Sequence, residues 1–246
     1  MMNAIFTLSQ TLHIGAGAFA LVLFWLPAFL RKGSANHSRF GRYYVYAMYC
    51  VAATGCTMAT LGLLDPLAVI SHPAKDAEAL AQQIATRSNT WIFLLYLSLL
   101  TVTTVRHGVL VLRHKTQRRQ LQAPVHLLLM AGLTVAGPLL AIWGHGQQQI
   151  LPVIFGVLGT LVGGGFLRYS FKASLSKMEW WIEHLGAMIG SGIACYTAFF
   201  AFGGSRLFVS HGNLQLLSWI LPGVIGVGFI RYLGKHYRRK FAGQGA

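Results

Sequence analysis

The sequence predicts an all-α fold, a single polytopic bundle of seven transmembrane helices over residues 1–246. The first reason is composition, since 54% of the chain is hydrophobic and only 10% is charged. Ordinary soluble domains carry about 25% charged residues. The second reason is that the apolar residues gather in long stretches, and about 20 helical residues cross the hydrocarbon core of a bilayer. The third is the placement of the basic residues, described below.

Seven stretches are long and apolar enough to be membrane helices. They are residues 5–30, 42–64, 90–112, 124–143, 150–169, 181–203 and 213–233. Helices are expected because backbone N–H and C=O groups in the hydrocarbon region must be paired within their own segment. The one sizeable outer loop, at about 65–89, contains a short helical pattern that Asp76 can cap, and we expect this short helix to lie on the outer surface.

The basic residues predict the orientation of the helices. The chain has 20 Lys and Arg against five acidic residues, which gives a net charge of +15. All of the Lys and Arg residues except Lys75, Arg87 and Arg206 lie at or after the ends of the first, third, fifth and seventh stretches. By the positive-inside rule, the N-terminus is outside and the C-terminus inside the cytoplasmic (inner) membrane. We expect the basic face to meet anionic lipids and no nucleic acid to bind.

Two motifs occur twice and indicate a duplicated helix hairpin. HLLLMAG begins at His126 and HLGAMIG at His184, so both segments read HLxxMxG. GFLRYSFK begins at Gly165 and GFIRYLGK at Gly228. The repeat hairpins are therefore 124–169 and 181–233, and they run in the same direction, unlike the inverted repeats of many transporters. A weaker third copy forms the hairpin 42–112, and the helix at 5–30 is an additional element.

Acidic residues are few and lie at predicted helix ends or in loops. They are Asp65, Asp76, Glu78, Glu179 and Glu183. Ion-coupled and proton-coupled carriers usually place carboxylates within the membrane. The sequence therefore argues against such coupling, and no motif assigns a catalytic residue.

Histidines form the candidate site. His126 and His184 occupy the same depth near the inner ends of two helices, and His107 approaches this layer from a third. His13 lies nearer the other face. Imidazole is a common metal ligand and a common axial ligand of haem. We therefore expect haem b between His126 and His184, which are also the candidate metal ligands, with His107 and His13 as alternates.

Three arginines border the same layer and could pair with haem propionates. They are Arg106, Arg168 and Arg231. A plainer interpretation remains open, in which the histidines bond to water or carbonyls, the arginines only anchor the topology, and no cofactor is bound. Contact with a quinone or another substrate is a third interpretation.

The segment HSRFGRYYV, which begins at His37, resembles a motif of an uncharacterised family of bacterial polytopic membrane proteins. Members of that family carry a basic inner loop of the type H-R-x-x-G-R-x-Y-V, and here Ser38 stands in place of the first arginine. The resemblance implies a similar topology and no particular chemistry. A looser analogy connects histidines on bundled helices with di-haem b-type cytochromes.

Three functions are compatible with these patterns. The first is a haem b-binding electron-transfer protein or subunit, which exchanges electrons with a quinone or a partner. The second is a small-molecule carrier without carboxylate coupling. The third is an accessory subunit of a larger membrane complex.

Overall fold

A computed structural model describes residues 1–203 and 213–243, and no strand occurs in these ranges. Eight α-helices are present there. They are α1 (Met2–Phe29), α2 (Ala35–Leu64), α3 (Pro66–Val69), α4 (Ala77–His114), α5 (Pro124–Gly146), α6 (Ile150–Ser170), α7 (Glu179–Ala198) and α8 (Asn213–Gly243). A 3-10 helix, η1 (Arg118–Gln122), precedes α5, and a π-helical turn (Phe199–Gly203) extends α7. The predicted all-α fold is confirmed.

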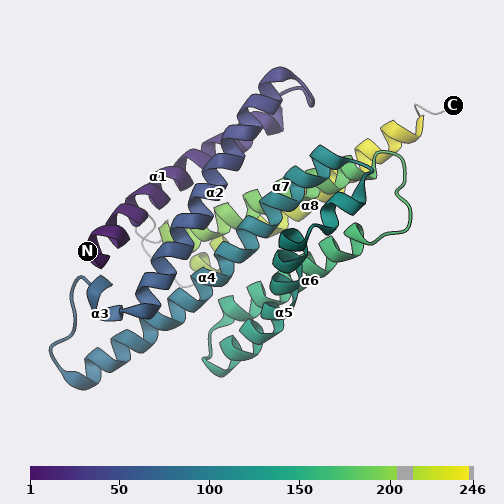
Figure 1. Cartoon of the computed structure of the whole chain (residues 1–246). Helices are drawn as coiled ribbons and strands as arrows, with labels where there is room; N and C mark the ends of the chain where they lie inside the picture. The colour runs from purple at the N-terminus through teal and green to yellow at the C-terminus, as the bar shows by residue number, and fades with distance from the viewer. Residues whose placement is uncertain (204–212, 244–246) are drawn as a thin grey trace.

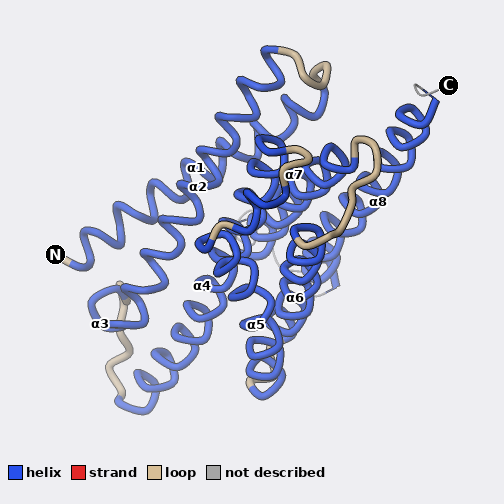
Figure 2. The backbone as a smooth tube through the Cα atoms, turned by 45° about the vertical axis from the view of Figure 1, so that its right-hand side comes forward, coloured by secondary structure: helices blue, strands red, loops and turns tan. Residues whose placement is uncertain are grey.

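The long helices alternate in direction and form one bundle (Figure 1). Helix α4 is central, because it packs against α2, α5, α6 and α7. Helix α1 packs on α2 and α7, and α8 packs on α7. The two chain ends lie at opposite ends of the bundle (Figure 1), and helices make up nearly the whole trace (Figure 2).

Five of the helices in the described part are long and apolar enough to cross a membrane, namely α1, α2, α4, α5 and α6. Many of their large apolar side chains are exposed, for example Leu128, Ile142 and Leu161, as expected for surfaces that face lipid. The chain is therefore a multi-pass membrane protein. Helix α7 is less apolar over the length needed to cross a membrane. Its first turns carry Glu183 and His184, and its α-helical part ends at Ala198. For α8, the side chains of residues 213–219 lie outside the description.

Two helices begin well before their predicted starts, and α8 continues to Gly243, past its predicted end at residue 233. Helix α4 is unbroken from Ala77 to His114, so the expected separate surface helix is its first turns. Asp76 caps it as predicted, by accepting a hydrogen bond from the Ala79 backbone N–H at 2.9 Å. Helix α2 begins at Ala35 with Ser34 as its cap, so the basic segment expected as an inner loop is helical. In both cases a polar sequence continues a membrane helix beyond the apolar core, because capping side chains satisfy the free N–H groups at the new end.

The two predicted repeat segments both form antiparallel hairpins, α5 with α6 and α7 with α8, and the hairpins run in the same direction (Figure 1). Small residues allow α5 and α6 to approach closely. A Cβ atom on Gly156 would lie 2.5 Å from the carbonyl oxygen of Gly137 and 2.8 Å from the backbone nitrogen of Ala141. Glycine at position 156 is therefore required by the contact between the two backbones.

Candidate functional site at a buried histidine pair

Helices α4 and α5 bring two imidazoles into direct contact. His107 Nδ1 lies 3.2 Å from His126 Nε2, and the two rings are nearly parallel, with centroids 5.4 Å apart. Both side chains are fully buried, at 0% exposure. The start of α5 fixes the depth of His126, because Pro124 occupies the first helical turn and the His126 N–H bonds to the carbonyl of Ala123. The structure thus places a polar pair inside the bundle.

A carboxylate on α7 connects this pair to the surface. Glu183 Oε1 lies 3.1 Å from His107 Nε2, and the Glu183 side chain is 26% exposed. A neutral imidazole has one N–H donor and one acceptor nitrogen. If His107 donates its Nε2–H to the carboxylate, its Nδ1 accepts a hydrogen bond from the Nε2–H of His126. The Nδ1 of His126 then carries no proton. Glu183, His107 and His126 therefore form a hydrogen-bonded series that crosses α7, α4 and α5. We call these three residues the relay.

Aromatic rings from α6 enclose the relay. The ring of Phe166 stacks on His107 with centroids 3.9 Å apart, and the ring of Tyr169 meets it edge-on at 5.8 Å. Both residues belong to the GFLRYSFK motif. Their cover excludes water, and low local polarity strengthens hydrogen bonds and charge interactions within the enclosed group.

Several polar atoms around the relay are buried and have no hydrogen-bond partner within the described ranges. They are Nδ1 of His126, the hydroxyl of Tyr169, Nε of Arg106 and Oγ1 of Thr103. Buried polar groups in native proteins are nearly always paired, so each exception calls for a reason such as a bound water or ligand. Here the exceptions gather at one place, because Thr103 and Arg106 lie within about one turn of His107 on α4.

The second repeated histidine also contacts α4. His184 Nδ1 donates to the carbonyl oxygen of Gly108 at 2.9 Å. Thus His126 bonds to residue 107 and His184 to residue 108. A Cβ atom on Gly108 would lie 2.8 Å from Met188 Sδ and 3.2 Å from Ala187 Cβ, so α7 packs closely against α4 here. This bond holds the His184 ring and leaves its Nε2 for another partner.

The remaining predicted site residues are His13 and the three arginines. His13 bonds through Nδ1 to the Val51 carbonyl at 3.0 Å and to Thr54 Oγ1 at 3.1 Å, so it joins α1 to α2. Arg168 and Arg231 are exposed, whereas Arg106 is half-buried. The structure therefore brings His107, His126, His184 and Arg106 together, whereas His13 joins other helices and the side chains of Arg168 and Arg231 are exposed.

The donor set bears on the predicted haem or metal. In the part of the chain that the structure describes, no three His, Cys, Asp or Glu side chains converge as metal ligands would. His126 Nε2 is occupied by His107, so iron at that atom would require the hydrogen bond to break. His184 is better placed, since a backbone carbonyl on Nδ1 orients a histidine whose Nε2 binds a metal.

Sequence reasoning missed Glu183, Phe166 and Tyr169. Glu183 was predicted near a helix end, and it lies in the second turn of α7, where it pairs with a fully buried histidine. The sequence argument against proton coupling did not include a carboxylate with such a partner. One sequence difference could have pointed to Glu183. The residue before the repeated histidine is apolar in the first copy (Val125) and acidic in the second (Glu183).

Comparison with models of known families, with curated proteins and with solved structures finds no match to this chain. Its function is therefore inferred from the geometry of the relay and its surroundings.

Proposed function

We propose that this chain is a seven-span protein of the cytoplasmic membrane, with its N-terminus outside and its C-terminus inside. In this proposal it transfers protons between the cytoplasmic face and a ligand held inside the bundle, as part of membrane electron transfer. One observation carries the proposal. The relay begins at a partly exposed carboxylate, Glu183, and ends at a fully buried imidazole, His126, whose outer nitrogen has no partner among the described residues.

The position of Glu183 supports this direction of transfer. It lies near the start of α7, at the same end of the bundle as the basic loop residues Lys172 and Lys177. The positive-inside rule assigns that end to the cytoplasm. The relay would therefore open to the cytoplasmic face.

The chemistry of the relay supports proton transfer. An imidazole can accept a proton on one nitrogen while it releases another from the second. A proton that arrives at His126 Nδ1 would release the Nε2 proton to His107 Nδ1, and His107 would pass its Nε2 proton to Glu183. The reverse sequence delivers a proton to the ligand. Ionisable side chains within membrane helices are costly and typically mark such pathways.

The test is hydrogen exchange at the imidazole of His126, followed by NMR in lipid nanodiscs without added ligand. Glu183→Gln removes the group that takes the proton, so we expect exchange of the His126 ring N–H with water to slow roughly a hundredfold or more, the scale of one lost general base. The matched control is Glu179→Gln, which changes a carboxylate one turn earlier on the same helix. Equal exchange rates in the two variants would reject the relay.

A haem b at His184 is a second candidate, which the bond from His184 Nδ1 to Gly108 favours. Purified protein from cells supplied with haem would then show a Soret band that shifts on reduction with dithionite. His184→Ala should abolish the band, and His13→Ala should leave it unchanged. A spectrum without a Soret band would reject this candidate and leave the relay unaffected.

A further inference from the structure

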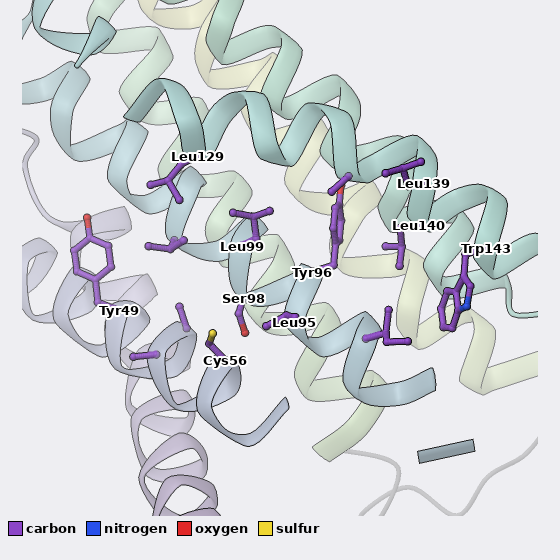
Figure 3. Close-up of a pocket in the computed structure, with 15 residues that line it drawn as sticks. Tyr49, Cys56, Leu95, Tyr96, Ser98, Leu99, Leu129, Leu139, Leu140 and Trp143 are labelled. Carbon is purple, nitrogen blue, oxygen red and sulfur yellow. The ribbon is translucent and has the colours of Figure 1, made fainter. Parts of the chain in front are cut away.

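An apolar groove of about 890 Å³ runs along α2, α4 and α5. Tyr49 and Leu129 lie at one end of it, and Leu140 and Trp143 lie at the other (Figure 3). Several lining residues, including Cys56 and Leu139, are exposed. The groove therefore opens sideways, onto the face of the bundle that meets the lipid tails.

The length of the groove favours a long flexible hydrocarbon chain. Leu129 and Trp143 are both on α5, and the rise of 14 positions from one to the other is about 21 Å at 1.5 Å per residue. One leaflet contributes about 15 Å to the hydrocarbon core. A lipid acyl chain that enters from the inner leaflet ends near the midplane, whereas a polyisoprenoid chain continues past it and can fill the groove.

Two polar side chains lie one turn beyond the inner end of the groove. Arg106 follows Val102 by one turn on α4, and His126 precedes Leu129 by one turn on α5, so each shares a helix face with a residue that lines the groove. The charge of Arg106 lies close enough to act on both Tyr49 and His126. Nε of Arg106 and Nδ1 of His126 are two of the buried atoms without a partner in the described ranges.

These atoms suit a neutral head group that carries oxygen acceptors. The Nε–H of Arg106 and the hydroxyl of Tyr49 can each donate a hydrogen bond to a carbonyl oxygen. His126 Nδ1, as the relay sets it, accepts one from a hydroxyl. A planar ring that bears carbonyl groups in one form and hydroxyl groups in the other satisfies all three side chains.

We propose that this groove binds a membrane quinone. Its isoprenoid chain lies between Leu129 and Trp143, and its head group lies at the inner end beside Tyr49, Arg106 and His126. The inference rests on the proposed function, because His126 is the residue through which the relay would reach the head group.

The test measures binding of ubiquinone with a long isoprenoid chain to the full-length protein in nanodiscs. Ala53→Trp and Ala136→Phe place a ring in the groove, and Arg106→Gln removes a donor at its inner end. We expect saturable binding to the unmodified protein and a Kd roughly tenfold higher or more in each of these variants, the effect of about 1.4 kcal/mol. The matched control is Leu161→Trp on the exposed face of α6, which should leave the Kd unchanged.

Two outcomes would overturn the inference. One is binding that does not saturate, or that is as tight in both groove-filling variants as in the Leu161→Trp control. The other is a phospholipid that co-purifies with the protein, is lost only in the groove-filling variants and is not displaced by ubiquinone. The relay is tested separately, because exchange at His126 is measured without quinone. If the protein binds quinone but the hydrogen-exchange rates at His126 are equal in Glu183→Gln and Glu179→Gln, the relay is rejected and the quinone site in the groove stands.

Discussion

His107 is the residue on which the candidate site depends. It is fully buried, one ring nitrogen faces Glu183 and the other faces His126, and Phe166 covers its ring. A polar side chain buried to this degree is tolerated only when it is hydrogen-bonded. His107 therefore has a structural role between α4, α5 and α7 as well as a proposed role in proton transfer.

Removal of His107 should be more harmful than neutralisation of its partner. His107→Leu leaves both Glu183 and His126 without that bond, and a buried polar group that loses its partner costs about 1–3 kcal/mol. In Glu183→Gln the amide oxygen can still accept from His107 Nε2, so the loss should be smaller. Thermal unfolding in detergent measures both. A larger effect of Glu183→Gln would show that charge, rather than hydrogen bonding, holds the site together.

A second carboxylate near the start of α7 gives a prediction about pH. Burial alone would raise the pKa of Glu179, but bonds from Lys172 Nζ (2.6 Å), the Ser176 N–H (2.7 Å) and the Ser176 hydroxyl (2.9 Å), with the charge of Lys172, lower the pKa below its ordinary value. A carboxylate with a lowered pKa stabilises the folded state at pH values above its ordinary pKa. This contribution is lost as the pH falls through the pKa of the carboxylate in the folded state.

Glu179→Gln should therefore destabilise the protein at neutral pH and make no difference in acid. Lys172 is 47% exposed, so the effect at neutral pH should be at most about 1 kcal/mol. Thermal midpoints of the two proteins at neutral and acidic pH give the comparison. A difference that persists unchanged in acid would contradict the assignment.

At the scale of the elements, the sequence predicted the helices well and their lateral contacts poorly. Apolar stretches and the repeated motifs placed His107, His126 and His184 at one depth. They could not show that His107 faces His126 and Glu183, because the rotation of α4 about its axis depends on packing. The bond between His107 and Glu183 joins residues 76 positions apart, and no local pattern reports such a distance. The starts of α2 and α4 were missed because polar residues extend both helices at that end.

The contact between α5 and α6 predicts different effects for two glycines of one helix. Gly156→Ala would place a Cβ against the backbone of α5, whereas a Cβ on Gly164 would meet no atom within 4 Å. We expect Gly156→Ala to cost about 1–3 kcal/mol through overpacking. Gly164→Ala should be neutral or slightly stabilising, because alanine favours helix over glycine. Denaturation of both variants tests the difference, and equal stabilities would show that α5 and α6 can move apart freely.

At the scale of the whole molecule, the direction of each helix connects the charge distribution with the relay. Between Lys75 and Lys177 the chain passes through three long helices, α4, α5 and α6, all of which are long and apolar enough to cross a membrane. An odd number of crossings places these two lysines on opposite sides. Both side chains are exposed, so each position can report its side of the membrane.

The orientation can be tested with single cysteines in a variant in which Cys50, Cys56 and Cys195 are replaced by serine. A maleimide that cannot cross membranes should label Lys75→Cys in intact spheroplasts. It should label Lys177→Cys only in inside-out vesicles, because positive charge is retained on the cytoplasmic side. The reverse pattern would turn the bundle over and place Glu183 at the outer face, so the relay would then draw its protons from outside. Labelling of both positions from one side would mean that one of the three helices does not cross.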